Sequence, residues 1–158
     1  MRVLHRHGRA SRASGFTIVE LLITIAIILT ISAIAIPNLL SAVNDARIAR
    51  AVGDVRTIGD QAMGYEVINY QPPPDLTTLG YGGNLDPWGH PYQYLSFTGL
   101  KGKGAMRKDR FLVPINTYFD LYSMGADGKS SSPLTAKASQ DDIIWANDGA
   151  FVGLASQF

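Results

Sequence analysis

Apolar residues dominate the part of this chain that follows its first fifteen residues. No Asp, Glu, Lys or Arg occurs in residues 21–44, and the centre of this segment reads LLITIAIILTISAIAI. A helix of about 20 apolar residues spans the hydrocarbon core of a bilayer. The segment therefore predicts a transmembrane helix, which we place at residues 16–40.

A different pattern follows Pro37. Apolar residues recur there at spacings of three and four, which is typical of an amphipathic helix; they are Val43, Ile48, Val52, Val55, Ile58, Ala62 and Tyr65. We expect one helix from Phe16 to about Val67, ending before the prolines at 72–74 because proline cannot continue a helix. Pro37 removes a backbone hydrogen bond, so it predicts a kink or a locally melted turn.

The length of this helix has a consequence for its surroundings. About 50 residues at 1.5 Å per residue give roughly 75–80 Å. The ~90 residues that follow are too few to bury such a rod, so its first half must be covered by lipid or by other subunits. Gly53, Gly59 and Gly64 weaken the second half by about 1 kcal/mol each relative to alanine, and they would permit close packing.

The region from residue 71 onward is rich in glycine and proline and contains short alternating segments. Residues 91–97 and 118–124 alternate most clearly, and residues 143–145 and 151–152 are weaker candidates for strands. Short strands separated by glycine-rich turns predict a small antiparallel sheet. We expect this sheet to pack on the helix between Ile48 and Tyr65, which gives an α+β fold with residues 71–158 as its head.

Composition and charge exclude several classes of protein. The 158 residues contain no cysteine, which excludes a disulfide framework and a cysteine nucleophile. Arg2, Arg6, Arg9 and Arg12 make the first fifteen residues basic, whereas acidic residues outnumber basic ones afterwards. A mildly acidic body argues against nucleic-acid binding. The sequence has no phosphate-binding glycine motif, nucleophile elbow or pair of catalytic carboxylates, so we expect no enzymatic activity.

One stretch of the head is strongly basic. Residues 99–110 read GLKGKGAMRKDR and carry five of the ten basic residues found beyond residue 15. We interpret this stretch as a solvated, mobile loop, which is the usual state of a run of charges, in preference to an electrostatic docking loop.

Three interpretations of the N-terminal segment follow from its residues. One is a cleaved secretory signal, with Ala33 and Ala35 in an A-x-A pattern, and another is a plain uncleaved anchor. The third rests on Glu20, at the edge of the apolar run. A carboxylate that enters hydrocarbon is costly unless it is paired, so it indicates a function; the alternative is that Glu20 is solvated at the headgroup level.

The string GFTIVELL, which begins at Gly15, resembles the processing signature of type IV prepilins and of the pseudopilins of type II secretion. The resemblance implies that a prepilin peptidase removes residues 1–15, cutting between Gly15 and Phe16, and that Phe16 is then N-methylated. It also implies that the segment around Pro37 loosens in a filament. Glu20 of one subunit would neutralise the new Phe16 amine of a neighbour and thereby fix the axial register.

Three strings in the head narrow the resemblance. They are DPWGHPYQY from Asp86, DLYSMGADG from Asp120 and DIIW from Asp142, and together they resemble the major pseudopilin of type II secretion systems. Heads of this family bind calcium in the loop between the last strands, so the resemblance implies a similar loop here.

Carried over position by position, the resemblance implies a set of calcium ligands. Asp127 and Asp142 are the side-chain candidates, with Asp141 as a substitute. Oxygens of Met124 and Ser130 would complete the shell, since calcium takes 6–8 oxygen ligands. The residues alone leave another interpretation open, an ordinary Asp-Gly turn beside a solvated pair of aspartates.

The resemblance as a whole implies a structural subunit of a type II secretion pseudopilus, which drives the export of folded proteins across the outer membrane. The implied partners are further copies of the chain, minor pseudopilins, the prepilin peptidase, the inner-membrane assembly platform and the membrane itself. The basic start would stay cytoplasmic, so the subunit is expected in the inner membrane as a single-pass protein with a periplasmic head. Two alternatives stay open, a type IV pilin of a surface fibre and a membrane-anchored periplasmic module that never polymerises.

Overall fold

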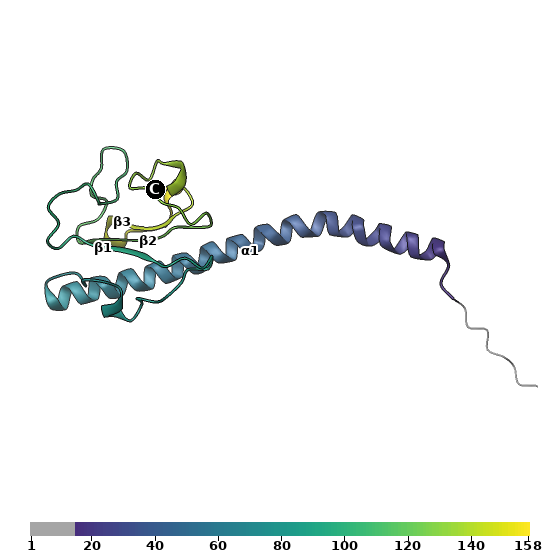
Figure 1. The fold of residues 1–158 in the computed structure, drawn as a ribbon, viewed down its shortest axis with the longest axis horizontal. Helices are drawn as coiled ribbons and strands as arrows, with labels where there is room; N and C mark the ends of the chain where they lie inside the picture. The colour runs from purple at the N-terminus through teal and green to yellow at the C-terminus, as the bar shows by residue number, and fades with distance from the viewer. Residues whose placement is uncertain (1–14) are drawn as a thin grey trace, which may run out of the picture. The chain divides into compact units, whose positions relative to one another are not determined.

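The computed structural model describes residues 15–158 of the protein. In this part of the chain one long helix, α1 (Ile18–Asn69), precedes four short strands, β1 (Gln93–Ser96), β2 (Phe119–Ser123), β3 (Ile143–Ala146) and β4 (Phe151–Leu154) (Figure 1). The expected α+β class, a long N-terminal helix with a small antiparallel sheet, is confirmed. The predicted leader, residues 1–15, lies outside the described residues except for Gly15.

Helix α1 is continuous through Pro37. It begins two residues after Phe16 and ends two residues after Val67, close to both predicted limits. Tyr70 then adopts a left-handed conformation with φ of 58°, and the chain turns away. The locally melted turn considered for Pro37 is therefore absent from α1, and loosening of this segment in a filament stays a prediction.

The chain divides into two compact units between Ser41 and Ala42. In the first unit, described from residue 15, consecutive apolar side chains are exposed; Ile18 is 79% exposed and Leu29 67%. An 18-residue stretch of α1 has a mean hydropathy of 2.6, so this helix is long and apolar enough to cross a membrane, by length and composition. The described residues of the unit leave its apolar surface uncovered, as its length and composition predict.

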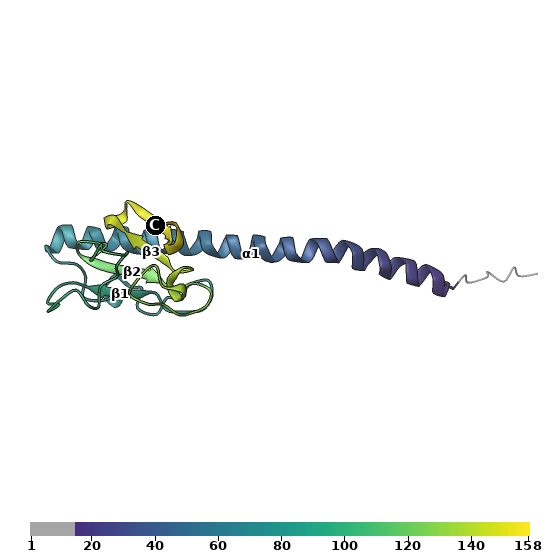
Figure 2. The ribbon, with the colours of Figure 1, turned by 90° about the horizontal axis from the view of Figure 1, so that it is seen from above.

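In the second unit the four strands form an antiparallel sheet in the order β1-β2-β3-β4, so each strand pairs with the next one along the chain. Figure 2 shows β1, β2 and β3 following one another in this order beside the helix. The clearly alternating segments 91–97 and 118–124 contain β1 and β2, and the two weaker candidates became β3 and β4.

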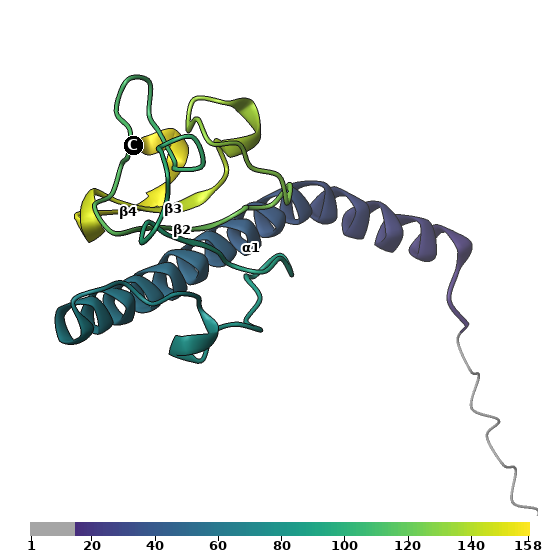
Figure 3. The same ribbon diagram turned by 60° about the vertical axis from the view of Figure 1, so that its left-hand side comes forward.

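One face of the sheet packs on the second half of α1 (Figure 3). The helix contributes Ala51, Val55, Ile58 and Ala62 to this core, at the spacing that predicted an amphipathic helix. The strands contribute Phe119, Leu121, Ile143 and Trp145. This packing confirms the predicted contact between the sheet and the helix, although Val43 of the predicted apolar face is 42% exposed.

Alternate residues of the strands face the other side of the sheet, as the pleat of a strand requires. Ile144 and Ala146 of β3 join a second buried cluster there with Ile115, Leu134 and Ala155. The loop before β2, the loop between β2 and β3 and the last turn of the chain therefore cover this side of the sheet.

Candidate functional site

The start of α1 holds the predicted processing and assembly residues. Gly15 and Phe16 lie in exposed, irregular chain before the helix, and Phe16 is 84% exposed. Glu20 Oε2 accepts hydrogen bonds from the Thr17 backbone N at 2.9 Å and from Thr17 Oγ1 at 2.8 Å. The Glu20 backbone N donates in return to Thr17 Oγ1 at 3.2 Å. This reciprocal arrangement is a capping box.

The capping box explains why α1 begins at Ile18. The first N–H groups of a helix have no partner within the helix, and the side chains of Thr17 and Glu20 satisfy two of the donors at this end. A carboxylate is also favourable near the positive end of the helix dipole. Within a single chain, then, Glu20 already has partners, and pairing with a neighbour's amine would use the remaining capacity of its carboxylate.

In the head, two of the three sequence strings, those from Asp86 and Asp120, meet at the buried carboxylate of Asp86, which is 4% exposed. Its Oδ1 accepts hydrogen bonds from the backbone N of Trp88 at 3.0 Å and of His90 at 2.9 Å. Its Oδ2 accepts one from Ser123 Oγ at 2.6 Å. Ser123 Oγ also accepts from the Gly125 backbone N at 3.1 Å. One carboxylate thus ties the turn at residues 86–90 to the end of β2.

His90 connects the same two segments. Its Nδ1 lies 3.2 Å from the Gly125 carbonyl oxygen. A Cβ atom on Gly128 would lie 2.6 Å from His90 Nε2, and Gly128 has φ of 65°, in the region that favours glycine. His90 therefore has a packing and hydrogen-bonding role in the head.

The predicted calcium ligands fall into two groups. In the first, the Asp127 backbone N donates to Asp141 Oδ2 at 3.1 Å. Asp127 Oδ1 in turn accepts a hydrogen bond from the Lys129 backbone N at 2.8 Å. Met124 lies directly after β2. In the second, Ser130 Oγ donates to Asp142 Oδ2 at 2.6 Å. Asp142 is fully buried, whereas Asp127 is exposed.

Arg107 brings a positive charge to the second group. Its Nη2 donates to Asp142 Oδ2 at 2.5 Å, and its Nη1 donates to Ser130 Oγ. Burial raises the pKa of Asp142 to about 6, against the opposing effects of the Ser130 hydrogen bond and the Arg107 charge. Asp142 is therefore mainly ionised at neutral pH, as an ion pair with Arg107 requires.

The burial of Arg107 corrects the interpretation of residues 99–110 as a wholly solvated loop. Lys101, Lys103 and Arg110 are exposed, but Arg107 is only 4% exposed. The Arg107 backbone N donates to Asp120 Oδ2 at 2.6 Å. Asp120 is itself only 1% exposed. Sequence reasoning missed this residue because the partners that bury it stand 13 and 35 positions away along the chain.

Comparison with known proteins identifies the family. A family described as the prokaryotic N-terminal methylation motif matches residues 10–36. The type II secretion system core protein G of Pseudomonas aeruginosa is 31% identical over 137 residues, which cover 73% of this chain and 85% of that protein. The chain belongs to the type II secretion system core protein G family, the major pseudopilins.

Two further members of this pseudopilin family are similar in sequence to the chain. The core protein G of Aeromonas hydrophila is 28% identical over 142 residues, covering 77% of this chain and 88% of that protein. The core protein G of Vibrio cholerae is 26% identical over 138 residues, covering 75% of this chain and 84% of that protein. No solved structure gives a significant match to the chain. The predicted resemblance to the major pseudopilin is therefore confirmed.

The fit of this pseudopilin head to calcium follows from the same contacts. Within residues 15–158, no three His, Cys, Asp or Glu side chains are grouped so as to hold a metal ion. Asp142 Oδ1 is buried without a hydrogen-bond partner among these residues. The other carboxylate oxygen, Oδ2, accepts a hydrogen bond from the Arg107 guanidinium. A Ca²⁺ ion on Oδ1 would lie within roughly 6 Å of that like charge. The described residues thus offer no ready cluster of three such side chains, and calcium binding stays a prediction.

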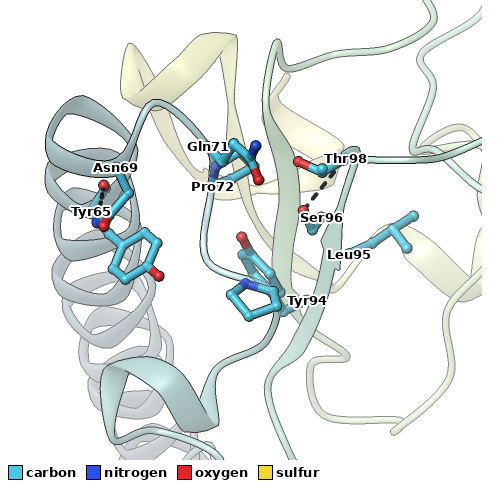
Figure 4. Close-up of a pocket in the computed structure, with 9 residues that line it drawn as sticks. Tyr65, Asn69, Gln71, Pro72, Tyr94, Leu95, Ser96 and Thr98 are labelled. Carbon is cyan, nitrogen blue, oxygen red and sulfur yellow. Dashed lines mark hydrogen bonds between the residues drawn. The ribbon is translucent and has the colours of Figure 1, made fainter.

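A surface pocket of the pseudopilin head lies between the end of α1 and β1 (Figure 4). Polar groups around it already bond within the fold: Asn69 Nδ2 donates to the Tyr65 carbonyl at 2.9 Å, and the Tyr94 hydroxyl donates to the Pro73 carbonyl at 2.8 Å. Burial, with the nearby Asp75 charge, raises the pKa of the Tyr94 hydroxyl above its ordinary value. We assign these groups to the joint between helix and sheet.

Proposed function

We propose that this chain is a polymerising subunit of a type II secretion pseudopilus that drives the export of folded proteins across the outer membrane. The observation that carries the proposal is the exposed apolar half of α1, which begins with a single acid, Glu20. Family membership and the N-terminal methylation motif support it. Such a surface needs lipid before assembly and the helices of other subunits afterwards.

Processing prepares the chain for this change of surroundings. A prepilin peptidase cuts between Gly15 and Phe16, and Phe16 is N-methylated. The exposed, irregular chain at these residues is what a protease needs at its cleavage site. The four arginines of the leader hold the first residues in the cytoplasm. The subunit thus spans the inner membrane once, and its head lies in the periplasm, where the assembly platform and minor pseudopilins are its partners.

Glu20 has two successive roles in this proposal. In the free subunit its carboxylate closes the capping box with Thr17. In the fibre it also pairs with the methylated amine of Phe16 on a neighbouring subunit. A charge left unpaired in such a buried position costs about 3–5 kcal/mol, so only the correct axial register is stable.

The first experiment reads the N-terminus. The protein purified from its native host is analysed by mass spectrometry, and the mature chain is expected to begin with N-methylated Phe16. A Gly15→Leu variant, in which the peptidase site is lost, should keep its leader and secrete nothing. Wild-type protein that still begins at Met1 would overturn the proposal and favour a membrane-anchored module.

The second experiment separates the two roles of Glu20. Glu20→Gln keeps hydrogen-bonding capacity for the cap but loses the charge, whereas Thr17→Val loses the cap and keeps the charge. Loss of the ion pair should lower fibre formation by about 100-fold or more in Glu20→Gln. Thr17→Val should lose only about 1 kcal/mol of helix-start stability and still assemble. Normal fibres from Glu20→Gln would contradict the pairing of Glu20 with the Phe16 amine.

Electron microscopy of wild-type cells tests the alternative of a type IV pilin. Short periplasmic fibres support a pseudopilus, and long surface fibres support a type IV pilin.

A further inference from the structure

Hydrogen bonds to the loop between β2 and β3 hold the segment that carries Arg107 in place. The Lys108 backbone N donates to the Ser132 carbonyl at 3.1 Å, and the Leu134 backbone N donates to the Lys108 carbonyl at 2.9 Å. Ser132 Oγ also donates to the Met106 carbonyl at 2.6 Å. The segment that carries Arg107 is therefore paired, through its backbone, with the loop between β2 and β3.

The side chain of Arg107 lies between this loop and the sheet. Its guanidinium carbon is 4.1 Å from the centre of the Tyr122 ring on β2. The two terminal nitrogens reach Ser130, within the loop that leads from β2 to β3, and Asp142, at the end of that loop. An arginine is suited to this position because its planar fork presents several donors in fixed directions and stacks on aromatic rings.

This arrangement takes up two of the five oxygen donors that the family resemblance assigned to calcium. Ser130 and Asp142 bind the guanidinium. The carboxylates of Asp127 and Asp141 accept backbone N–H groups of their own loop. Calcium needs 6–8 oxygens around one point, whereas the contacts of Ser130 and Asp142 converge on the guanidinium of Arg107.

We propose that the guanidinium of Arg107 is the structural cation of the loop between β2 and β3, so that this loop keeps its fold without a bound divalent metal. The cation that orders the loop is then part of the chain. The proposal concerns the folding of the head and does not depend on the secretion function.

The wild-type protein supplies the first arm of the test. The full-length chain in detergent micelles is melted in EDTA and in millimolar calcium chloride, and trypsin cleavage after Lys129 and Lys137, both exposed in the loop, is timed in each. A ligand that binds only the folded state raises its stability. We expect Tm values that agree within about 1 °C and equal cleavage rates.

The variants supply the second arm. Arg107→Gln leaves Asp142 buried without its cation, and loss of one partner of a buried pair should lower the Tm of the head by about 10 °C. Cleavage after Lys129 and Lys137 should become about ten-fold faster or more. Arg107→Lys, which keeps the charge and loses the fork, should fall between the two. Lys101→Gln removes an exposed charge from the same basic stretch and should change neither quantity.

Two results would overturn the proposal. One is a wild-type Tm that rises by more than about 5 °C in calcium, with slower loop cleavage, because the loop then depends on a metal. The other is an Arg107→Gln protein that behaves like Lys101→Gln. Should Arg107→Gln fail to fold, the wild-type arm in EDTA and calcium decides the question alone.

Discussion

At the scale of single residues, Gly59 brings the backbone of α1 against the indole ring of Trp145. A Cβ atom at this position would lie 2.2 Å from Trp145 Cε3, whereas Gly53 and Gly64 have open space around them. The three glycines look equivalent in the sequence, because each weakens the helix to the same degree. Only the position of Trp145, 86 residues further along, makes Gly59 different.

This contact predicts opposite effects for two identical substitutions. Gly59→Ala should lower the free energy of unfolding of the head by about 1–3 kcal/mol, because the new methyl group overlaps the indole. Gly64→Ala should raise it by up to about 1 kcal/mol, since alanine is the better helix former. Urea unfolding followed by tryptophan fluorescence measures both. Equal effects of the two variants would show that Trp145 does not pack closely on the helix.

Buried acids give the head a pH dependence of defined sign. The pKa of Asp142 is raised from 3.8 to about 6, mainly by burial. The folded protein therefore holds this proton more firmly than the unfolded chain does, and the free energy of unfolding falls as the pH rises from about 4 to about 6. The shift corresponds to at most about 3 kcal/mol. Burial also raises the pKa of Asp120, which acts in the same direction.

Urea midpoints of the full-length protein at pH 4.5 and pH 7 measure this dependence. We expect the midpoint to be higher at the lower pH, and Asp142→Asn should reduce the difference because one of the two titrating groups is gone. Asp127→Asn, which changes an exposed carboxylate in the same loop, should leave it unchanged. An Asp142→Asn protein with the wild-type difference between the two pH values would assign the dependence to another group.

At the scale of elements, the structure confirmed the clear patterns of the sequence as well as the two weaker strand candidates, which became β3 and β4. The three- and four-residue spacing gave α1, and the alternation at residues 91–97 and 118–124 gave β1 and β2. These patterns are visible because each element buries one face, and the spacing of the buried residues distinguishes a helix from a strand. The positions of Asp86 and Arg107 were not predictable, since single polar residues have no period and their partners are distant in the chain.

The continuous helix at Pro37 makes a prediction for the free subunit. Proline removes one hydrogen bond from the helix, so Pro37→Ala should stabilise this turn by about 3 kcal/mol. Hydrogen exchange of the amides around residues 33–37 should then slow by up to about 100-fold in detergent micelles, and Asn38→Ala serves as the neighbouring control. If loosening at Pro37 is needed in the fibre, Pro37→Ala should also assemble poorly. Unchanged exchange would mean that Pro37 does not weaken α1.

At the scale of the whole molecule, the two compact units have different surfaces. The unit from Ala42 onward buries its own cores, whereas the described part of the unit before it exposes its apolar side chains. This difference could be predicted from the sequence, because a helix of roughly 78 Å, the length of 52 residues, exceeds what the head can cover. It follows that the second unit has what a domain needs to fold alone.

A fragment of residues 42–158 tests this inference. It should be a soluble monomer without detergent, with one cooperative unfolding transition and a near-ultraviolet circular dichroism signal from Trp88 and Trp145. The full-length chain should need detergent, because about 20 apolar residues stay exposed in water. Size-exclusion chromatography and thermal melts compare the two proteins. An aggregated fragment without tertiary signal would show that the head requires the preceding helix.

The exposed stretch at residues 98–105 suits the attachment of a reporter. The chain has no native thiol, so Lys101→Cys would create a unique position for a maleimide dye or a spin label. The label would stand on the exposed surface of the head, on side chains that its two cores do not use. The fluorescence of such a label, or its distance to a label on a second copy, would report whether and when subunits assemble as proposed.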